Sequence, residues 1–147
     1  MSRHFLALIA VGSFLVGSTV SADESSEAKN AALLAAVKKL DVAFEKQDTA
    51  TIRTLVDVNH ISIAPSYQFF NRKDQLKTLP ELKITLFETA PKTILHLTPR
   101  TALISYKAKL AGTYAGKPLP ARVQILESWV KRKGKWVETS YQETQIP

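Results

Sequence analysis

The spacing of apolar residues changes once along this chain, and that change most constrains its fold. Up to about residue 80 the apolar residues recur every three or four positions, as on one face of an α-helix; the clearest series is Leu33, Val37, Leu40 and Phe44. From Lys83 onward they alternate with polar residues, as in half-buried strands; the clearest series is Ala102, Ile104, Tyr106, Ala108 and Leu110. The order predicts an α+β domain with about three N-terminal helices packed on one face of a curved, mainly antiparallel sheet.

The helical part divides into three predicted helices. The first has about five turns, with a polar face formed by Lys38, Lys39, Asp41 and Lys46. Asp48 or Thr49 can cap a second, shorter helix, and residues 60–64 alternate as a short strand. Asn71, with Asp74 three positions later, resembles a capping box for a brief third helix that Pro80 closes.

About four sequential strands, joined by short turns, are expected from Lys83 to the end. One of them runs from Ala102 to Tyr114, and Gly112 with residues 116–118 marks the next corner. The last two run from Arg122 to Val130 and from Trp136 to Ile146. Four cations lie between them, at positions 131, 132, 133 and 135, and Gly134 supplies the positive φ that a tight turn needs. We therefore interpret this basic cluster as the solvent-exposed tip of a hairpin.

The basic charge of the chain, formally +7, raises the question of a polyanionic partner. The cations are scattered, and the sequence has neither an RNA-binding aromatic signature nor zinc-finger spacing. A solvated surface and no nucleic-acid partner is the favoured interpretation; weak attraction to anionic lipid or polysaccharide is the alternative.

The first 22 residues have the layout of a secretory signal peptide. A weakly basic start precedes the apolar run from Phe5 to Val16, and the small residues of Val20-Ser21-Ala22 come next. We expect cleavage after Ala22 and a single domain over residues 23–147; an uncleaved anchor is the alternative. The run is short for a membrane span of about 20 residues, so no span is expected after cleavage. The absence of cysteine fits a periplasmic or secreted protein held together by its core alone.

The closing hairpin carries a family resemblance. Trp129, the stretch from Lys133 to Trp136, Gln142 and Thr144, together with "RTALI" at residues 100–104, are similar to the nuclear transport factor 2-like (NTF2-like) superfamily. More narrowly, the chain resembles small exported SnoaL-like proteins of the type called domain of unknown function 4440. The resemblance implies a cone-shaped roll, in which a strongly bent sheet encloses a pocket beside a long helix, and a homodimer formed through the outer sheet face. The same cone hosts enzymes, ligand binders and assembly domains.

The resemblance to ketosteroid-isomerase-like and SnoaL-like enzymes gives poor matches for catalytic residues. Helix 1 carries Phe44 and no tyrosine, the strands carry no aspartate after Asp74, and no inward acid with a histidine partner is expected. Weak acid/base candidates are Glu127, Glu138 and His96: the two glutamates form either a buried pair with one raised pKa or a pair of solvated residues. His96 is either a satisfied sheet histidine or a ligand contact. No metal site and no cofactor are predicted.

The pocket-lining residues are expected to come from one face of each late strand and from the aromatic stretch at residues 67–70. On the last strand that face would hold Trp136, Glu138, Ser140, Gln142 and Thr144. The stretch at 67–70 is expected to be non-helical, as a lid or as a plug of the core. The full predicted set is Tyr67, Phe70, His96, Tyr106, Glu127, Trp129, Trp136, Ser140 and Gln142.

Three functions are compatible with these features. The favoured one is non-catalytic binding of a small apolar or amphipathic molecule in the cone. The alternatives are a homodimeric interaction or assembly domain, and a cofactor-free isomerase or cyclase.

Overall fold

A computed structural model describes residues 22–147 of the 147-residue chain. Apart from Ala22, the predicted signal peptide at residues 1–22 lies outside the described residues. The elements follow in the order α1 (Ala22–Glu45), α2 (Thr49–Leu55), β1 (Val56–Ala64), β2 (Tyr67–Phe69), α3 (Arg72–Thr78), a single 3₁₀ turn (Leu79–Glu81), β3 (Leu82–Thr89), β4 (Thr93–Thr98), β5 (Thr101–Tyr114), β6 (Lys117–Pro118), β7 (Arg122–Arg132) and β8 (Lys135–Gln145).

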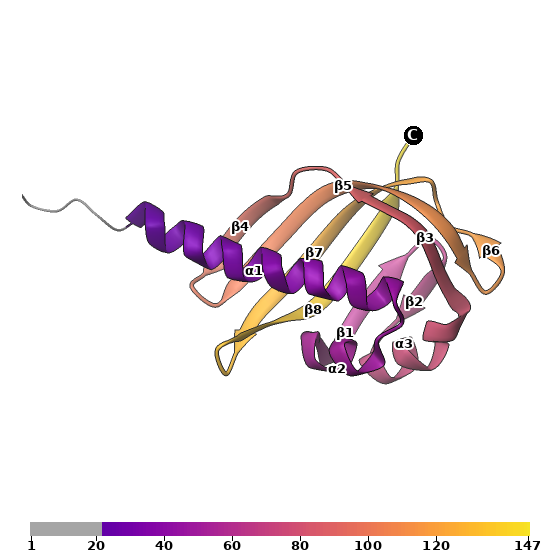
Figure 1. Cartoon of the computed structure of the whole chain (residues 1–147), viewed down its shortest axis with the longest axis horizontal. Coiled ribbons are helices and arrows are strands. Elements are labelled where there is room, and N and C mark those ends of the chain that lie inside the picture. The colour runs from indigo at the N-terminus through magenta and orange to yellow at the C-terminus, as the bar shows by residue number, and fades with distance from the viewer. Residues whose placement is uncertain (1–21) are drawn as a thin grey trace, which may run out of the picture.

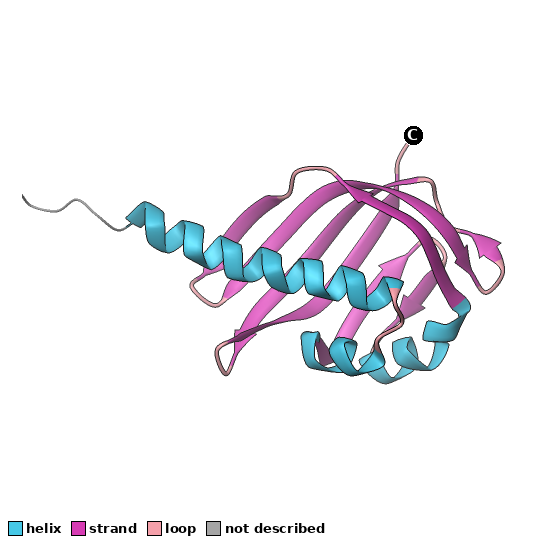
Figure 2. Ribbon diagram, viewed as in Figure 1, coloured by secondary structure: helices cyan, strands magenta, loops and turns pink. Residues whose placement is uncertain are grey.

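The strands form one strongly curved sheet, and α1 lies along its concave side (Figure 1). The strand order is β2-β1-β8-β7-β5-β3, with β4 and β6 also paired to β5. β1 pairs with β8 in parallel, and the other pairs are antiparallel. Figure 2 shows α2 and α3 gathered at one end of the sheet. The predicted α+β cone is confirmed, although the sheet has more strands than the sequence pattern indicated.

The apolar face of α1 forms the centre of the core, as its spacing predicted. Leu33, Val37 and Leu40 are buried there, and Phe44 packs at the edge of the core cluster. Burial of each such side chain contributes about 1.5–3 kcal/mol. From β5, alternate residues from Ala102 to Leu110 face α1, because successive side chains of a strand point to opposite faces.

The helix starts follow the predicted caps. Asp48 Oδ1 accepts a hydrogen bond from Thr51 N at 3.1 Å and begins α2. Asn71 Oδ1 accepts from Asp74 N at 2.8 Å and begins α3. Gln47, in the link between α1 and α2, donates from Nε2 to the carbonyl of Leu82 at 2.8 Å. The two caps fix where the small helices begin, and the Gln47 bond joins the α1–α2 link to the start of β3.

The closing hairpin also forms as predicted, with β7 and β8 antiparallel from Val123 to Gln145. Its turn has positive φ at Lys133 and Gly134, and residues 132–135 are exposed. Arg132 is the one cation of this cluster in an ion pair within residues 22–147, because its Nη2 lies 3.0 Å from Asp57 Oδ2. The basic cluster is therefore the tip of a hairpin.

Two irregularities in the sheet were not predicted. Trp129 pairs with Glu138, but Ser128 pairs with Ser140, so Thr139 is an extra residue in β8. Such a bulge moves all later side chains to the opposite face. The second irregularity lies opposite Gly112, where β3 shifts register between Ile84 and Leu86. The strand predicted from Ala102 to Tyr114 is confirmed as β5, but Gly112, which was assigned to the corner after it, lies within the strand.

Candidate functional site

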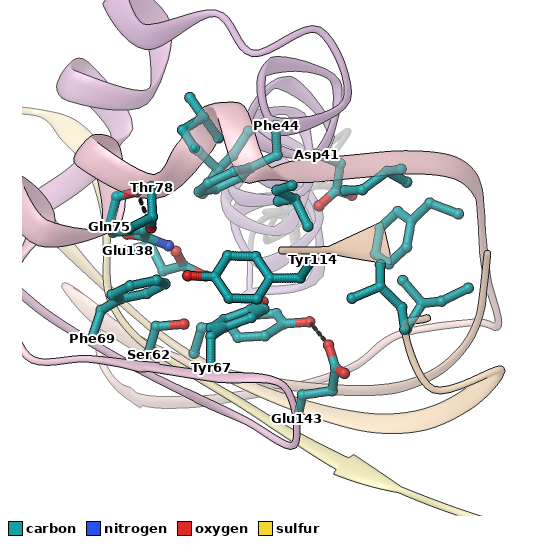
Figure 3. Close-up of a pocket in the computed structure, with 18 of the residues that line it drawn as sticks. Asp41, Phe44, Ser62, Tyr67, Phe69, Gln75, Thr78, Tyr114, Glu138 and Glu143 are labelled. Carbon is teal, nitrogen blue, oxygen red and sulfur yellow. Dashed lines mark hydrogen bonds between the residues drawn. The ribbon is translucent and has the colours of Figure 1, made fainter. Parts of the chain in front are cut away.

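The site is a cavity between the concave face of the sheet, the C-terminal half of α1, α3 and β3 (Figure 3). The centre of a water-sized sphere can occupy about 80 Å³ within it, and the whole hollow with its mouth contains about 810 Å³ of space free of atoms. Its wall is formed by Leu40, Asp41, Phe44, Ser62, Tyr67, Phe69, Gln75, Thr78, Leu79, Leu82, Ile84, Phe87, Leu110, Tyr114, Leu119, Glu127, Glu138, Tyr141 and Glu143.

This wall combines apolar side chains with acids. Leucines and phenylalanines come from α1, the 3₁₀ turn, β3 and β5, whereas the acids are Asp41 of α1, Glu127 of β7, and Glu138 and Glu143 of β8. Among the residues that the structure describes, no lysine or arginine lines the cavity. The cavity is thus amphipathic and purely acidic.

Glu127 is held at the inner end of the cavity by two neighbouring side chains. The Tyr106 hydroxyl donates a hydrogen bond to Glu127 Oε1, and Trp129 Nε1 donates to Oε2 at 2.7 Å. The side chain is almost completely buried. Burial and then the nearby Glu138 raise the pKa of Glu127 to about 7, while the two hydrogen bonds and Lys92 oppose this shift.

Asp41 extends the acidic cluster onto the helix. Its pKa is raised to about 7, chiefly by burial and then by the charge of Glu127; Lys92 counteracts this. Lys92 stands behind Tyr106, with its Nζ 4.2 Å from the centre of that ring. A carboxyl with a pKa near 7 exists in both protonation states at neutral pH, so Asp41 and Glu127 can each give or take a proton there.

Glu138 lies beside His60. The expectation that no inward acid has a histidine partner was therefore wrong. His60 Nε2 lies 3.0 Å from Glu138 Oε2, although the two are not aligned as a hydrogen bond. Burial lowers the pKa of His60 to about 4, against smaller opposing effects of Asp57 and Glu127. Burial and then Asp41 raise the pKa of Glu138 well above its usual range. At neutral pH His60 is therefore uncharged, so the contact is not an ion pair with a cationic histidine.

Aromatic side chains from β2, β5 and β8 form another part of the cavity wall. Tyr67 stacks on Phe69 with ring centres 5.3 Å apart, and Tyr114 lies 5.2 Å from Tyr67 in a tilted arrangement. Tyr141 donates from its hydroxyl to Glu143 Oε2 at 2.7 Å (Figure 3). Burial raises the pKa of Glu143, and the hydrogen bond from Tyr141 opposes that rise.

Two buried polar atoms in the cavity wall lack a partner among the described residues. They are Ser62 Oγ and Gln75 Oε1, and their side chains are 0% and 8% exposed. An unpaired buried polar atom costs about 1–3 kcal/mol. Both atoms are therefore available to a bound molecule.

The predicted pocket residues divide into three groups. Tyr67 and Glu127 line the cavity, as does the acid candidate Glu138. Tyr106 and Trp129 lie directly behind Glu127.

The other five are placed elsewhere. Trp136 is buried but does not line the cavity. The centre of the His96 ring lies 6.2 Å from that of the Trp136 ring, and His96 Nε2 lies 2.7 Å from Asn30 Oδ1. His96 therefore does not converge with the two glutamates, and that expectation was wrong. Phe70 is 65% exposed and outside the cavity wall.

Ser140 and Gln142 were wrongly placed on the inner face. The bulge at Thr139 reverses the alternation of β8, so that Trp136 and Glu138 point inward before it and Tyr141 and Glu143 after it. Gln142 is exposed. The expectation that Glu127 and Glu138 are solvated was wrong as well, because both are 2% exposed.

Sequence reasoning missed Asp41, His60, Ser62, Tyr141 and Glu143. Asp41 was placed on the polar face of the first helix, although it stands four positions after Val37 and three before Phe44. That spacing was a usable signal for an inward position. The other four depend on pairings and a bulge that the sequence pattern does not reveal.

Nothing in the described part of the chain brings together three or more side chains able to hold a metal ion. No helix within residues 22–147 has an apolar stretch long enough to cross a membrane.

No family model matches the sequence, so the narrower assignment to domain of unknown function 4440 has no support. No curated protein matches it either. Solved structures do match. An NTF2-like protein from Cytophaga hutchinsonii is 19% identical, with a TM-score of 0.71 over 78% of this chain and 95% of that one.

Two further structural neighbours are named as an enzyme and as an association domain. A scytalone dehydratase candidate from Novosphingobium aromaticivorans is 12% identical, with a TM-score of 0.70 over 85% of this chain and 89% of that one. The association domain of C. elegans CaMKII is 14% identical, with a TM-score of 0.67 over 83% and 99%. At these identities the likeness concerns the fold alone. The chain has the fold of the NTF2-like superfamily.

Proposed function

We propose that this chain binds a small apolar or amphipathic molecule in the cavity beside α1 and does not transform it. The observation that carries the proposal is the cavity itself. Its apolar wall and its buried acids meet around space that side chains leave free. A mostly apolar hollow with a few convergent polar groups is the usual form of a small-molecule site.

The size of the cavity limits the ligand. One water needs about 10–15 Å³ of the volume open to its centre, so 80 Å³ accommodates several groups of that size. With about 1 kcal/mol of binding free energy per non-hydrogen atom, a ligand of about six such atoms would have a Kd of tens of micromolar. The ligand is therefore a small metabolite-sized molecule.

A blocking variant tests this function. In Leu119→Trp a larger side chain replaces a residue of the cavity wall; in the matched control Leu95→Trp the same change is made at an exposed residue of β4, outside the cavity wall. Binding of a panel of small apolar and amphipathic molecules is followed by ligand-observed NMR. We expect binding to the wild type and the control and not to Leu119→Trp, with circular dichroism showing that all three are folded. Equal binding by both variants, or no binding by the wild type, contradicts the proposal.

Acid/base catalysis without a cofactor is the second candidate, favoured by the two carboxyls of pKa about 7 in one cavity. A general acid or base works best when its pKa is near the working pH. The test is exchange of solvent deuterium into C–H groups next to the carbonyl of a bound ketone. This function requires exchange with the wild type and its loss in Asp41→Asn. A bound ketone that acquires no deuterium excludes such proton transfer.

Self-association through the outer face of the sheet is compatible with either function. Ile61 and Ile63 of β1 and Leu126 of β7 are about two-fifths exposed, and Ile63 and Leu126 flank Gln142 of β8 on that face. We propose a homodimer in which this face packs against itself, since an isologous interface uses one patch twice. Light scattering should give a dimer for the wild type and a monomer for Ile63→Asp/Leu126→Asp. A monomeric wild type contradicts this.

Export is part of the same proposal. The signal-peptide pattern supports a periplasmic or secreted protein that begins at Asp23 after cleavage. The intact mass of protein recovered from a periplasmic extract measures this directly. A mass that retains residues 1–22 contradicts it.

A further inference from the structure

We propose that the ligand of this cavity carries a positive charge, and that it is a small protonated amine with an apolar body. The inference rests on the proposed binding function and names its ligand class. It begins from the charges of the wall, where Asp41, Glu127, Glu138 and Glu143 are exposed to the cavity while no lysine or arginine of the described residues lines it. This is unexpected in a chain with a formal charge of +7.

Asp41, Glu127 and Glu138 influence one another, so these three acids form one cluster. Glu138 raises the pKa of Glu127, Glu127 raises that of Asp41, and Asp41 raises that of Glu138. The groups that face this cluster from other elements are few. Lys92, whose Nζ lies 4.2 Å from the centre of the Tyr106 ring, lowers the pKa of both Asp41 and Glu127, and His60 of β1 is neutral above about pH 4. Lys92 does not line the cavity, so no cation of the described residues meets a ligand inside it.

Two hydrogen-bond acceptors indicate independently that a donor belongs here. Gln75 Oε1 and Ser62 Oγ are buried in the wall without an aligned hydrogen bond, although the Tyr67 hydroxyl lies close enough to Ser62 for that contact to lower the pKa of Tyr67. They lie on α3 and β1, and Figure 3 shows Gln75 beside Glu138. An ammonium group has only N–H donors and no acceptor, so it can bond to these oxygens and to the carboxylates together. A carboxylate or phosphate ligand would find a donor in the Ser62 hydroxyl but none in Gln75 Oε1, and the ionised acids of the cavity wall would repel it.

The aromatic part of the wall also suits a cation. Tyr67, Phe69 and Tyr114 are packed together beside the acids, and Phe44 comes from α1 (Figure 3). A cation within about 6 Å of an aromatic ring centre is attracted by the negative face of the ring. The leucines of the cavity wall would pack against the apolar body of the ligand.

Binding should be linked to proton release. An ammonium ion favours the ionised form of a nearby carboxyl, so its entry displaces a proton from the cluster to solvent. Asp41 and Glu127, each with a pKa of about 7, are the groups that lose it. Below pH 7 the affinity should increase by up to about tenfold per pH unit for each proton displaced, and it should level off above pH 8.

Three probes with the same apolar body test the charge preference: 3,3-dimethylbutylammonium, 3,3-dimethylbutanol and 3,3-dimethylbutanoate. Affinities are measured by calorimetry at pH 6 and pH 8, in two buffers of different ionisation enthalpy so that released protons are counted. We expect the amine to bind at least about tenfold more tightly than the alcohol at pH 8, the effect of one hydrogen bond to a charged group. We expect the butanoate not to bind.

Two variants locate the effect. Asp41→Asn should reduce the amine's affinity at least tenfold and leave that of the alcohol nearly unchanged. The matched control is Glu88→Gln. The carboxylate of Glu88 on β3 is exposed and lies 3.6 Å from Lys109 Nζ, so its replacement should change the affinity of neither the amine nor the alcohol.

The outcomes separate the two proposals. If the alcohol or the butanoate binds as tightly as the amine, the cationic ligand is wrong and the small-molecule site stands. The cationic ligand is also wrong, and the small-molecule site still stands, if binding of the amine releases no proton between pH 6 and pH 8. If none of the three probes binds, both proposals fail.

Discussion

Replacement of Glu127 by glutamine should change how the stability of the protein depends on pH. The unfolded carboxyl has a pKa of 4.5 and the folded one about 7. Between these values the folded state holds a proton that the unfolded state has lost, so stability falls as pH rises. The loss is about 1.4 kcal/mol per pH unit, or about 3 kcal/mol over the whole window.

Glutamine has the shape of glutamate and cannot ionise. Its Oε1 can accept from Trp129 Nε1, and its Nε2 can donate to the Tyr106 hydroxyl, so both contacts of Glu127 have a counterpart. The variant should therefore gain about 3 kcal/mol relative to the wild type between pH 4 and pH 8. The comparison at each pH removes most of the opposite contribution of His60, whose lowered pKa makes stability rise with pH between about 4 and 6.5, because Glu127 has only a smaller effect on His60 than burial.

Urea unfolding, followed by the fluorescence of the buried Trp129 and Trp136, measures this difference. Glu88→Gln, on the exposed pair with Lys109, should stay within about 0.5 kcal/mol of the wild type across the range. The reasoning is refuted if Glu127→Gln follows the wild type at every pH, or if it loses stability relative to the wild type as pH rises.

Three further changes can be checked in the same urea experiment. Gly112→Ala should lower the free energy of unfolding by more than about 3 kcal/mol, because a Cβ there, at φ +147°, would lie 1.9 Å from the Lys83 carbonyl oxygen. The control Gly116→Ala, at φ +78° with open space around it, should lower it by about 1 kcal/mol, and equal losses would contradict the contact. Tyr106→Phe removes a donor to Glu127 and should cost about 1–3 kcal/mol and raise the pKa of Glu127 further; a pKa that falls would show that the hydroxyl does not stabilise the carboxylate. Arg132→Ala should cost about 1 kcal/mol by leaving the mostly buried Asp57 unpaired, against less than 0.5 kcal/mol for the exposed Lys135→Ala; a neutral Arg132→Ala would show that this pair is screened.

The fold could be predicted from the sequence because its local signals agree. The apolar series of α1, the caps at Asp48 and Asn71, and the Gly134 turn each specify an element by the chemistry of a few neighbouring residues. The two apolar periods then leave few ways to bury both faces, and the α+β cone is one of them.

The site could be predicted only in part, because it depends on how distant segments meet. The bulge at Thr139 exchanges the two faces of β8, so that Gln142 moves outward and Glu143 inward. The contact of His60 with Glu138 requires the parallel pairing of β1 with β8, for which the sequence has no local signal. Asp41 is different: helical spacing places it beside Val37 and Phe44, and that inward position could have been recognised.

The ionisation state of Asp41 and Glu127 tests the central claim, a buried acidic cavity without its own countercharge. A carbon-13 NMR titration of the side-chain carboxyls, with assignment by Asp41→Asn and Glu127→Gln, measures it residue by residue. We predict that both carboxyls titrate near pH 7 in the free protein and at lower pH once a small amine is bound. Titration of both at the ordinary pH of about 4, unaffected by the amine, would contradict the account.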